Sequence, residues 1–364
     1  MSQASLINPF THWPCTDQKK TRKKITDPID GIHFFFRKVK IPVQAILLEQ
    51  LSHQDVPTVF LFGSPHIDNY TRTHLGCGLI DFDRAIYGPY FSDLAYALLS
   101  MSLKQKVDYT QTLDVHIAQK LFEAYLQGLT QPDLPIPVVP LLADRILEPW
   151  QLDGRAYLDA KKGWVKKAYK NPLPKDHPML QELLRQFFKN SAGNETVEDQ
   201  ELLHVGYGQG SMGRDHYIYL IQNSHQIRVL DIKPAKDYRT HLWPHGIYYQ
   251  HPFKHEGERM IFATETLAPH MRDLESTAYL NGIQYWGRVV PFTQCKIKEL
   301  LDHDSLLHFA QAAGIQMGQG HARTASNLEE ITLHLERHQD QLMTCVQQMH
   351  QQIVDAWHFY CKIR

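Results

Sequence analysis

The sequence predicts an α+β fold in which a β-rich module is inserted into a helical body. Short apolar runs bounded by glycine and proline, a pattern typical of strands, occur near the start and again after residue 200. Residues 90–190 and the segment after residue 303 have mostly helical periodicity. A polar segment at 190–200 separates the first helical region from a stretch in which apolar residues alternate with period two. These observations predict four segments, listed as 1–30 (irregular), 31–195 (first helical part), 196–298 (β-rich) and 299–364 (second helical part).

The expected elements follow from these periodicities. Apolar runs predict three early strands, at 31–40, 56–63 and 76–83. Helical spacing predicts a helix over 90–102, capped by Ser92 or Asp93. Further helices are expected at 112–129, 154–170, 177–191 and 257–270, and from 303 to the end. A hairpin is expected from two strands, 216–222 and 227–233, joined by the turn NSHQ, and another strand pair over 279–292.

Composition excludes several classes of protein. The formal net charge of −1 gives no overall field that would attract nucleic acid. The five cysteines have no CxxC pair, which predicts a reduced, cytoplasmic chain rather than a disulfide scaffold. No apolar run approaches the length of a transmembrane helix. The basic run KKTRKK at 19–24 reads as a solvated segment, with a phosphate- or lipid-facing patch as the alternative.

A glycine-rich segment, VGYGQGSMG, precedes the predicted hairpin, and from Gly208 it reads G-x-G-x-x-G through Gly210 and Gly213. Glycines let backbone amides approach phosphate groups. A dinucleotide site would require a helix next, whereas HYIYLIQ predicts a strand, and the second strand ends at Lys233. This order is typical of a kinase nucleotide-binding lobe, so we interpret 196–298 as such a lobe. The alternative is a glycine-rich hairpin with an edge lysine.

A lysine in this role needs a carboxylate from the next helix to hold its position. Glu258 and Glu265 both lie on the predicted helix GERMIFATETL, and we favour Glu258.

Oxygen-bearing side chains follow two of the predicted early strands. Asp81 ends the run GLID, and Asn69 lies in the preceding turn. Magnesium takes one or two oxygen ligands from protein and the rest from phosphate and water. Asn69 and Asp81 are therefore candidate magnesium ligands, with Asp68 and Asp83 as further candidates. The alternative is a turn at Asp68-Asn69 and a strand-end cap at Asp81.

Several of these motifs resemble the phosphotransferase branch of the protein-kinase-like superfamily, the aminoglycoside and choline kinase type. GSPHIDN resembles its catalytic loop G-D-x-H-x-x-N, LIDFD its metal-binding strand end, and GPYFSDLAYAL the helix that follows. Residues 30–325 resemble more closely the uncharacterised bacterial family called domain of unknown function 2252. The shared motifs are FFFRKVK (with Lys38 where that family has glycine), the glycine loop, and GHARTA with His321 and Arg323.

The resemblance implies a two-lobed, circularly permuted kinase-like fold that uses ATP and Mg²⁺, because the catalytic-loop half precedes the glycine loop. It also places Ser64 where the family has its catalytic aspartate. A serine does not accept a proton at neutral pH as a carboxylate does, and losing a general base costs about 10²–10⁴-fold in rate. Asp68 is the candidate substitute, so the candidate catalytic residues are Ser64 and Asp68.

The expected function is therefore a phosphotransferase, weakened at Ser64, that acts on a small molecule or protein. A catalytically inactive pseudokinase, serving as a nucleotide-binding scaffold or regulator, is the main alternative. A structural protein that binds no ligand is the third. The sequence leaves the phosphate acceptor open.

Overall fold

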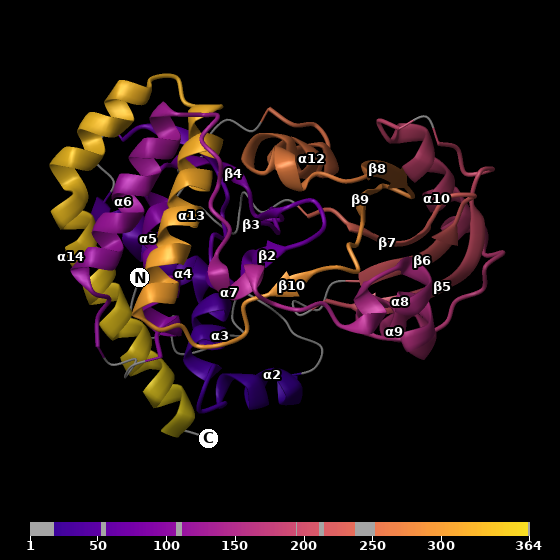
Figure 1. The fold of residues 1–364 in the computed structure, drawn as a ribbon, viewed down its shortest axis with the longest axis horizontal. Helices are drawn as coiled ribbons and strands as arrows, with labels where there is room; N and C mark the ends of the chain where they lie inside the picture. The colour runs from indigo at the N-terminus through magenta and orange to yellow at the C-terminus, as the bar shows by residue number, and fades with distance from the viewer. Residues whose placement is uncertain are drawn as a thin grey trace.

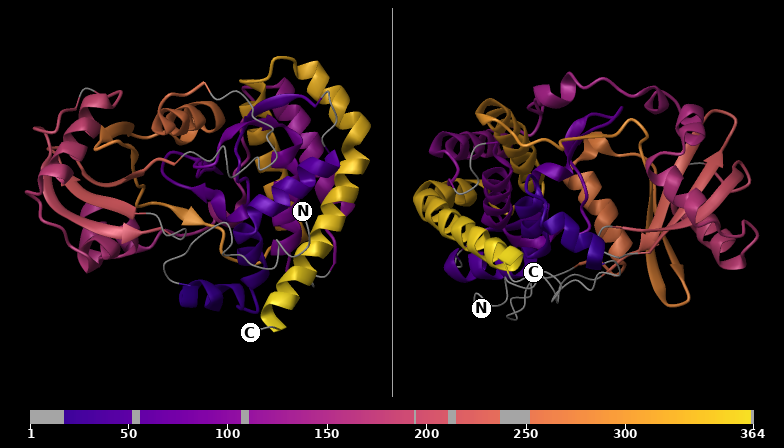
Figure 2. Two further views of the ribbon diagram at one scale, coloured as in Figure 1. Left: turned by 180° about the vertical axis from the view of Figure 1, so that it is seen from behind. Right: turned by 90° about the horizontal axis from the view of Figure 1, so that it is seen from below.

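The computed structural model describes residues 18–51, 56–106, 111–193, 195–210, 215–236 and 252–362. A helical part and a sheet part lie side by side, joined by short strands and extended segments (Figure 1). The views from behind and from below show the same two parts (Figure 2).

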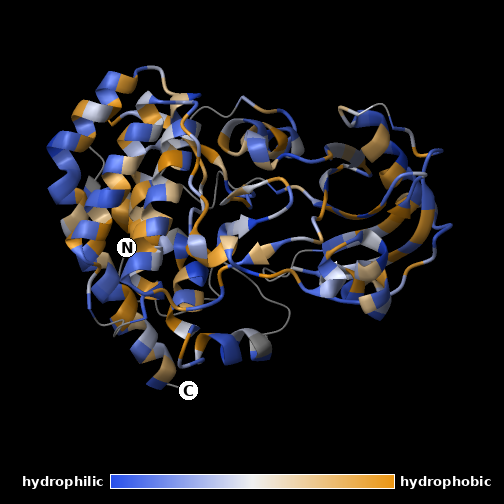
Figure 3. Ribbon diagram, in the orientation of Figure 1, coloured by the Kyte–Doolittle hydropathy of each residue, from blue (hydrophilic) through white to orange (hydrophobic). Residues whose placement is uncertain are grey.

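The helical part is built on a large apolar core. Its main helices are α3 (Gly31–Lys38), α4 (Lys40–Leu51), α5 (Phe91–Lys104), α6 (Val115–Thr130), α13 (His303–Ala322) and α14 (Leu328–Lys362). Hydrophobic and hydrophilic residues alternate along the long helices (Figure 3), as one-sided burial requires. Helix α14 has 35 residues, yet none of the described helices is apolar enough over sufficient length to cross a membrane.

Glycines allow α6 and α13 to pack with their backbones in contact. A Cβ atom at Gly318 would lie 2.1 Å from the carbonyl oxygen of Tyr125, and one at Gly128 would lie 2.2 Å from that of Ile315. This close packing places His321, near the end of α13, inside the helical part.

Short strands connect the helical core to the sheet part. β1 (Thr58–Leu61) pairs antiparallel with β4 (Ile86–Pro89). β2 (Tyr70–Arg72) pairs with β3 (Cys77–Leu79) and, on its other edge, with β10 (Cys295–Lys296). These pairings bring the loops after β1 and β3, and the late segment around β10, to one region.

The sheet part is a five-stranded antiparallel sheet in the order β5-β6-β7-β9-β8. Its strands are β5 (Glu201–Gln209), β6 (Asp215–Gln222), β7 (Ile227–Pro234), β8 (Glu275–Leu280) and β9 (Ile283–Val289). Ile218 and Leu220 of β6 pack in one apolar cluster, and Tyr219 and Ile221 in another. Because alternate residues of a strand point to opposite faces, the sheet is covered on both sides.

Helices that precede the sheet in sequence cover it. α8 (Gly154–Ala160) and α9 (Gly163–Lys170) contribute to one of the two clusters, and α10 (Pro178–Asn190) to the other. The first helical region predicted from sequence therefore ends too late, since its last three helices pack on the sheet. The helix expected over 154–170 is divided, because Lys161 and Gly163 have positive φ angles of 48° and 49°. Helix α12 (Glu256–Leu267) lies between the two parts (Figure 1).

Most of the expected elements are confirmed: the strands at 56–63 and 76–83, the helices, and both hairpins. The strand expected at 31–40 is wrong, since this stretch forms α3 and the start of α4. Its continuous apolar run is buried on nearly all sides, and such a run does not distinguish a buried strand from a buried helix. The N-terminal segment is also not wholly irregular, because Gln18–Ile25 forms helix α2 around the basic run.

Candidate active site

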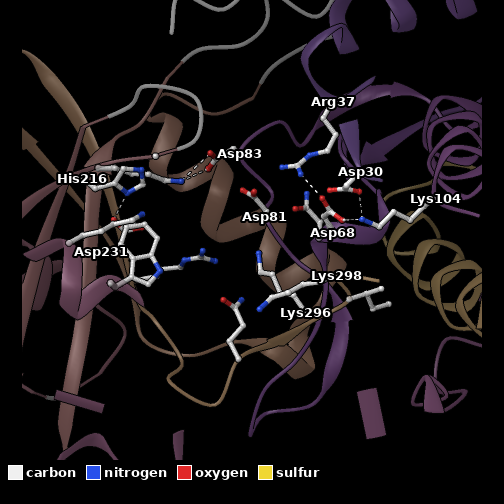
Figure 4. Close-up of a pocket in the computed structure, with 18 residues that line it drawn as sticks. Asp30, Arg37, Asp68, Asp81, Asp83, Lys104, His216, Asp231, Lys296 and Lys298 are labelled. Atoms are coloured by element: carbon white, nitrogen blue, oxygen red, sulfur yellow. Dashed lines mark hydrogen bonds and ion pairs between the residues drawn. The ribbon is translucent and has the colours of Figure 1, made fainter. Parts of the chain in front are cut away.

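A cavity of about 440 Å³ lies between the two parts of the molecule. The segments of the helical part that line it contribute Asp30, Arg37, Asp68, Asn69, Asp81, Asp83 and Lys104. The sheet part contributes Trp164, Lys167, Gly210, His216, Asp231, Lys233 and Arg288, and the segment around β10 contributes Gln294, Lys296, Ile297 and Lys298. Charged side chains from both parts point into the cavity (Figure 4).

The loop after β1 requires a glycine at residue 63. Gly63 has a φ angle of +70°, and a Cβ atom there would lie 2.0 Å from the carbonyl oxygen of Arg84. Only glycine fits a positive φ at such a close approach. The loop that carries Ser64 therefore lies directly against the loop that carries Asp81 and Asp83.

Asp93 of α5 anchors this loop. Its carboxylate accepts hydrogen bonds from the backbone N–H groups of Phe62, at 2.6 Å, and Gly63, at 3.0 Å. His321 Nε2 lies 3.1 Å from the same carboxylate, and its Nδ1 lies 3.0 Å from the hydroxyl of Tyr125. The expected capping role of Ser92 or Asp93 is wrong, because α5 has no side-chain cap, and Asp93 points back to the loop. The GHARTA motif thus contributes His321 to loop support.

Both candidate magnesium ligands line the cavity. The amide nitrogen of Asn69 donates to the backbone oxygen of Ser64 at 3.1 Å, which leaves the side-chain oxygen as an available acceptor. Asp81 is exposed, has a φ angle of 78°, and forms no hydrogen bond or ion pair with the described residues. One amide oxygen and one carboxylate facing the same space fit the one or two protein ligands that magnesium takes.

Lys233 is held by Asp83. Its ammonium group lies 2.8 and 3.0 Å from the two carboxylate oxygens of Asp83, and 4.9 Å from the centre of the Trp286 ring. The expected pairing with Glu258 is wrong, since Glu258 is exposed on α12. Glu265 is paired instead with Arg272 at 2.7 Å.

Helix α12 turns a different residue inward. This residue is Arg259, which is only 2 % exposed. Its guanidinium donates hydrogen bonds to the backbone oxygens of Ala85 and Asp83. It also forms an ion pair with Glu256 at 2.7 Å. Adjacent helix residues point about 100° apart, so burial of Arg259 turns Glu258 away from the cavity.

The glycine loop is described only in part. Gly208 lies in β5, Gly210 lines the cavity, and Gly213 lies outside the described residues. A Cβ atom at Gly210 would lie 2.6 Å from Nε2 of His216. The absence of a side chain at residue 210 therefore keeps this edge of the cavity open.

A buried histidine–aspartate pair lies under the glycine loop and was not expected from the sequence. Nδ1 of His216 is 2.5 Å from Asp231, and both side chains are nearly fully buried. Burial alone would raise the pKa of Asp231, but His216, Lys233 and Arg288 together outweigh it and the net shift is downward. The signal in the sequence was a polar residue inside each of two otherwise apolar strands.

Asp68 is enclosed by basic side chains. Arg37 lies 2.5 Å and Lys104 3.3 Å from its carboxylate, and His33 lies 3.7 Å away. Burial by itself raises the pKa of Asp68, but these neighbours outweigh it and lower the pKa below its ordinary value. A carboxylate stabilised in this way is a poor proton acceptor.

The same cluster is unsuited to a metal ion. Asp30, His33 and Asp68 offer three ligand atoms within 4.8 Å of one another. However, the ammonium group of Lys104 already lies 2.5 Å from Asp30 and contacts Asp68 as well. Arg37 and Lys104 therefore provide the positive charge that an ion would provide.

Ser64, which stands in place of the expected catalytic aspartate, has a lysine as its partner. Oγ of Ser64 is 2.6 Å from Nζ of Lys40, which is 1 % exposed. Ser64 itself is partly exposed.

Three cations of the cavity have no carboxylate partner at bonding distance among the described residues. Lys296 and Lys298 point into the cavity across from Asp81 (Figure 4). The buried Nε of Arg288 has no hydrogen-bond partner in the described part of the chain. Burial lowers the pKa of Lys296, although Asp81 opposes this shift. The sequence signal for the two lysines was the alternation in CKIK, which places both on one side of the strand.

Comparisons with known proteins give two family matches. Residues 23–135, which carry Ser64, Asn69, Asp81 and Asp83, match the model of the phosphotransferase enzyme family. The N-terminal part is thus of the kinase-like phosphotransferase type. Residues 181–363, 183 of the 364, match the model of the family described as "Uncharacterized protein conserved in bacteria (DUF2252)", and the chain belongs to that family. No curated protein and no solved structure has a significant match to the chain.

Proposed function

We propose that the protein binds ATP with Mg²⁺ in the cavity and acts as a kinase-like phosphotransferase on a small molecule or protein. The observation that carries this proposal is the shared lining of one cavity. Asn69 and Asp81 come from the segment of phosphotransferase type, whereas Gly210 and Lys233 come from a segment more than 100 residues later. Phosphoryl transfer depends mainly on positioning and charge neutralisation, and this lining offers both.

Each residue has a role in this proposal. Gly208 and Gly210, and Gly213 outside the described residues, would let the backbone approach the phosphates, and Lys233, held by Asp83, would contact them. Asn69 and Asp81 would hold magnesium, which when bound neutralises charge on the phosphate oxygens. We assign Asp68 to the placement of Arg37 and Lys104 rather than to proton transfer, and Asp83 takes the role first given to Glu258.

We further propose that the chain order is a circular permutation of the kinase-like fold. The segment of phosphotransferase type comes first, and the sheet with the glycine loop and Lys233 comes later. The nucleotide lobe then comprises the five-stranded sheet together with α8, α9 and α10, so it begins well before residue 196. A cytoplasmic location remains a prediction.

Thermal shift measured with Mg-ATP tests the binding step. We expect stabilisation of the wild type, and loss of most of that shift in Lys233→Met, which keeps the apolar stem but removes the charge. Lys189→Met, an exposed lysine on α10, is the matched control and should behave as wild type. Equal shifts in both variants, or no shift in the wild type, would exclude nucleotide binding in this cavity.

Transfer of γ-labelled phosphate to small-molecule pools and to protein tests catalysis. The second candidate, an inactive nucleotide-binding scaffold or regulator, is favoured by Ser64 in place of the expected aspartate. It predicts Mg-ATP stabilisation without turnover in the wild type and also in Ser64→Asp. Label in any acceptor rules out that second candidate.

A further inference from the structure

The pairing of Ser64 with Lys40 distinguishes this site from one that uses a carboxylate base. A serine next to a proton acceptor at 2.6–3.2 Å is the arrangement of an activated nucleophile, and lysine is one of the acceptors that proteins use. Here Oγ and Nζ are 2.6 Å apart. Within the described part of the chain, Nζ of Lys40 forms this hydrogen bond and none to a carboxylate.

The surroundings of Lys40 favour its neutral form. Burial lowers the pKa of Lys40 well below that of a free lysine, and the guanidinium of Arg84 lowers it further. The carboxylates of Asp93 and Asp81 oppose this shift. The ring of Tyr96, 5.0 Å from Nζ, also favours the charged form. Burial and Arg84 outweigh these groups, so Lys40 gives up its proton more readily than a free lysine.

Hydrogen bonds to the backbone hold the loop that carries Ser64 in place. Asp93 binds the two backbone N–H groups that precede Ser64, and Asn69 binds its carbonyl oxygen. Gly63 packs the loop against the backbone of Arg84 and Ala85. Ser64 is not itself among the residues that line the cavity, but its backbone is hydrogen-bonded to Asn69, which does line it, and its hydroxyl is partly exposed.

We propose that Ser64 is a phosphorylation site of the protein itself, with Lys40 as the proton acceptor and a nucleoside triphosphate as the phosphoryl donor. This inference rests on the proposed function. Oγ of Ser64 forms a bond to the γ-phosphorus, and the bond from that phosphorus to the β,γ-bridging oxygen breaks. The nucleoside diphosphate leaves with that electron pair, and the hydroxyl proton moves to Nζ of Lys40. The ammonium group then returns the proton to water.

The test is mass spectrometry of the whole chain after incubation with Mg-ATP, with peptide mapping of the phosphate. We expect one phosphate, on Ser64, and none on that peptide in Ser64→Ala. The matched control Ser224→Ala changes an exposed serine in the β6–β7 turn and should be phosphorylated as wild type.

Lys40 variants separate chemistry from structure. We expect Lys40→Met to slow phosphorylation of Ser64 by about 10²–10⁴-fold, the range for loss of a general base. Lys40→Arg retains a donor to Ser64 but does not deprotonate, so it should be equally slow. If Lys40 only positions Ser64, Lys40→Arg should be phosphorylated at a rate near that of wild type. In the wild type the rate should rise with pH through a pKa lower than that of a free lysine.

The outcomes distinguish this inference from the proposed function. If Mg-ATP stabilises the wild type and Ser64 carries no phosphate, the inference is overturned while nucleotide binding stands. Phosphate found only on another residue would likewise overturn the inference about Ser64 while nucleotide binding stands. Circular dichroism shows whether each Lys40 variant folds. If one does not, Ser64→Cys provides the second comparison. A thiol at residue 64 should change the rate of phosphorylation while Lys40 stays in place. If Mg-ATP does not bind at all, both proposals fail together.

Discussion

Two regions of the cavity differ in whether their charged side chains are paired with opposite charges. Around Asp68, carboxylates and cations neutralise one another at bonding distance: Arg37 and Lys104 contact Asp68, and Lys104 contacts Asp30. Across the cavity, Lys296 and Lys298 have no such partner among the described residues. The first cluster has the features of a structural support, because its charges are already compensated. The second retains charge for an anionic ligand, and the following predictions test this division.

The largest effect is expected from Asp68→Ala, which leaves Arg37 and Lys104 without their anion. Removing one partner of a buried ion pair costs about 3–5 kcal/mol in the free energy of unfolding, and we expect the lower end because Asp68 is not fully buried. Urea denaturation measures this change. Glu182→Ala, at an exposed pair with Arg185, is the control and should leave stability unchanged. A loss no larger than that of the control would show that the Asp68 cluster is not structural.

The same cluster predicts acid sensitivity. The pKa of Asp68 is lower in the folded chain than in the unfolded chain. Its contribution is therefore complete above the unfolded pKa, about 4, and is lost as the pH falls below that value. We expect the difference in stability between wild type and Asp68→Ala to shrink below pH 4. A difference that stays constant down to pH 2 would argue against this ion pairing.

A smaller effect is expected at Glu275, which faces Arg288 across β8 and β9. Burial raises the pKa of Glu275 to about 7, although Arg288 opposes the shift. A raised folded pKa means that the wild type loses stability as the pH rises from about 4.5 to 7. Glu275→Gln should therefore be more stable than wild type at pH 8, by on the order of 2 kcal/mol, and similar at pH 4.

Thermal denaturation of wild type and Glu275→Gln at the two pH values measures this difference. Glu201→Gln, an exposed carboxyl at the start of β5, is the matched control. The same change at both pH values would show that Glu275 does not titrate in this range.

The uncompensated lysines should affect ligand binding more than stability. Lys296→Met and Lys298→Met are each expected to weaken Mg-ATP binding about tenfold, which corresponds to about 1.4 kcal/mol. Isothermal titration calorimetry measures the change, with Lys189→Met as the control. Unchanged affinity in both variants would place the phosphates elsewhere in the cavity.

The smallest effect is expected from Glu258→Gln. Because Glu258 is exposed and Lys233 is paired with Asp83, the change in unfolding free energy should stay within about 0.5 kcal/mol. Mg-ATP stabilisation should also equal that of wild type. A clear loss of that stabilisation would indicate that α12 rotates toward Lys233 when nucleotide binds.

Much of the secondary structure was predictable from local patterns. The hairpin that ends at Lys233, the amphipathic helices and the strand before Asp81 were all expected from periodicity. Residues 31–40 were not, because an apolar run buried on all sides carries no period that separates helix from strand. The attachment of α8–α10 to the sheet was also hidden, since an apolar face does not indicate which surface will cover it.

The sequence predicted which residues form the candidate site better than it predicted which of them interact. Asn69, Asp81, Gly210 and Lys233 were expected, and all four line the cavity. The partner of Lys233 was not, because Asp83 lies 150 residues away and the rotation of α12 depends on the burial of Arg259. Lys40, the first residue of α4, was missed because the segment was read as a strand.

The sequence by itself determined which chemical groups this protein has: the residues of the two family patterns, the glycine loop, and a serine at residue 64. Only the tertiary structure decided which groups face each other, and so which charges are compensated. The physical reason is that hydrophobic periodicity is a local property, whereas the pKa and reactivity of a group depend on burial and on partners far away in the chain. Lys40 and Ser64 are the clearest case, because neither residue indicates reactivity by its type, whereas their hydrogen bond suggests a nucleophile with a proton acceptor.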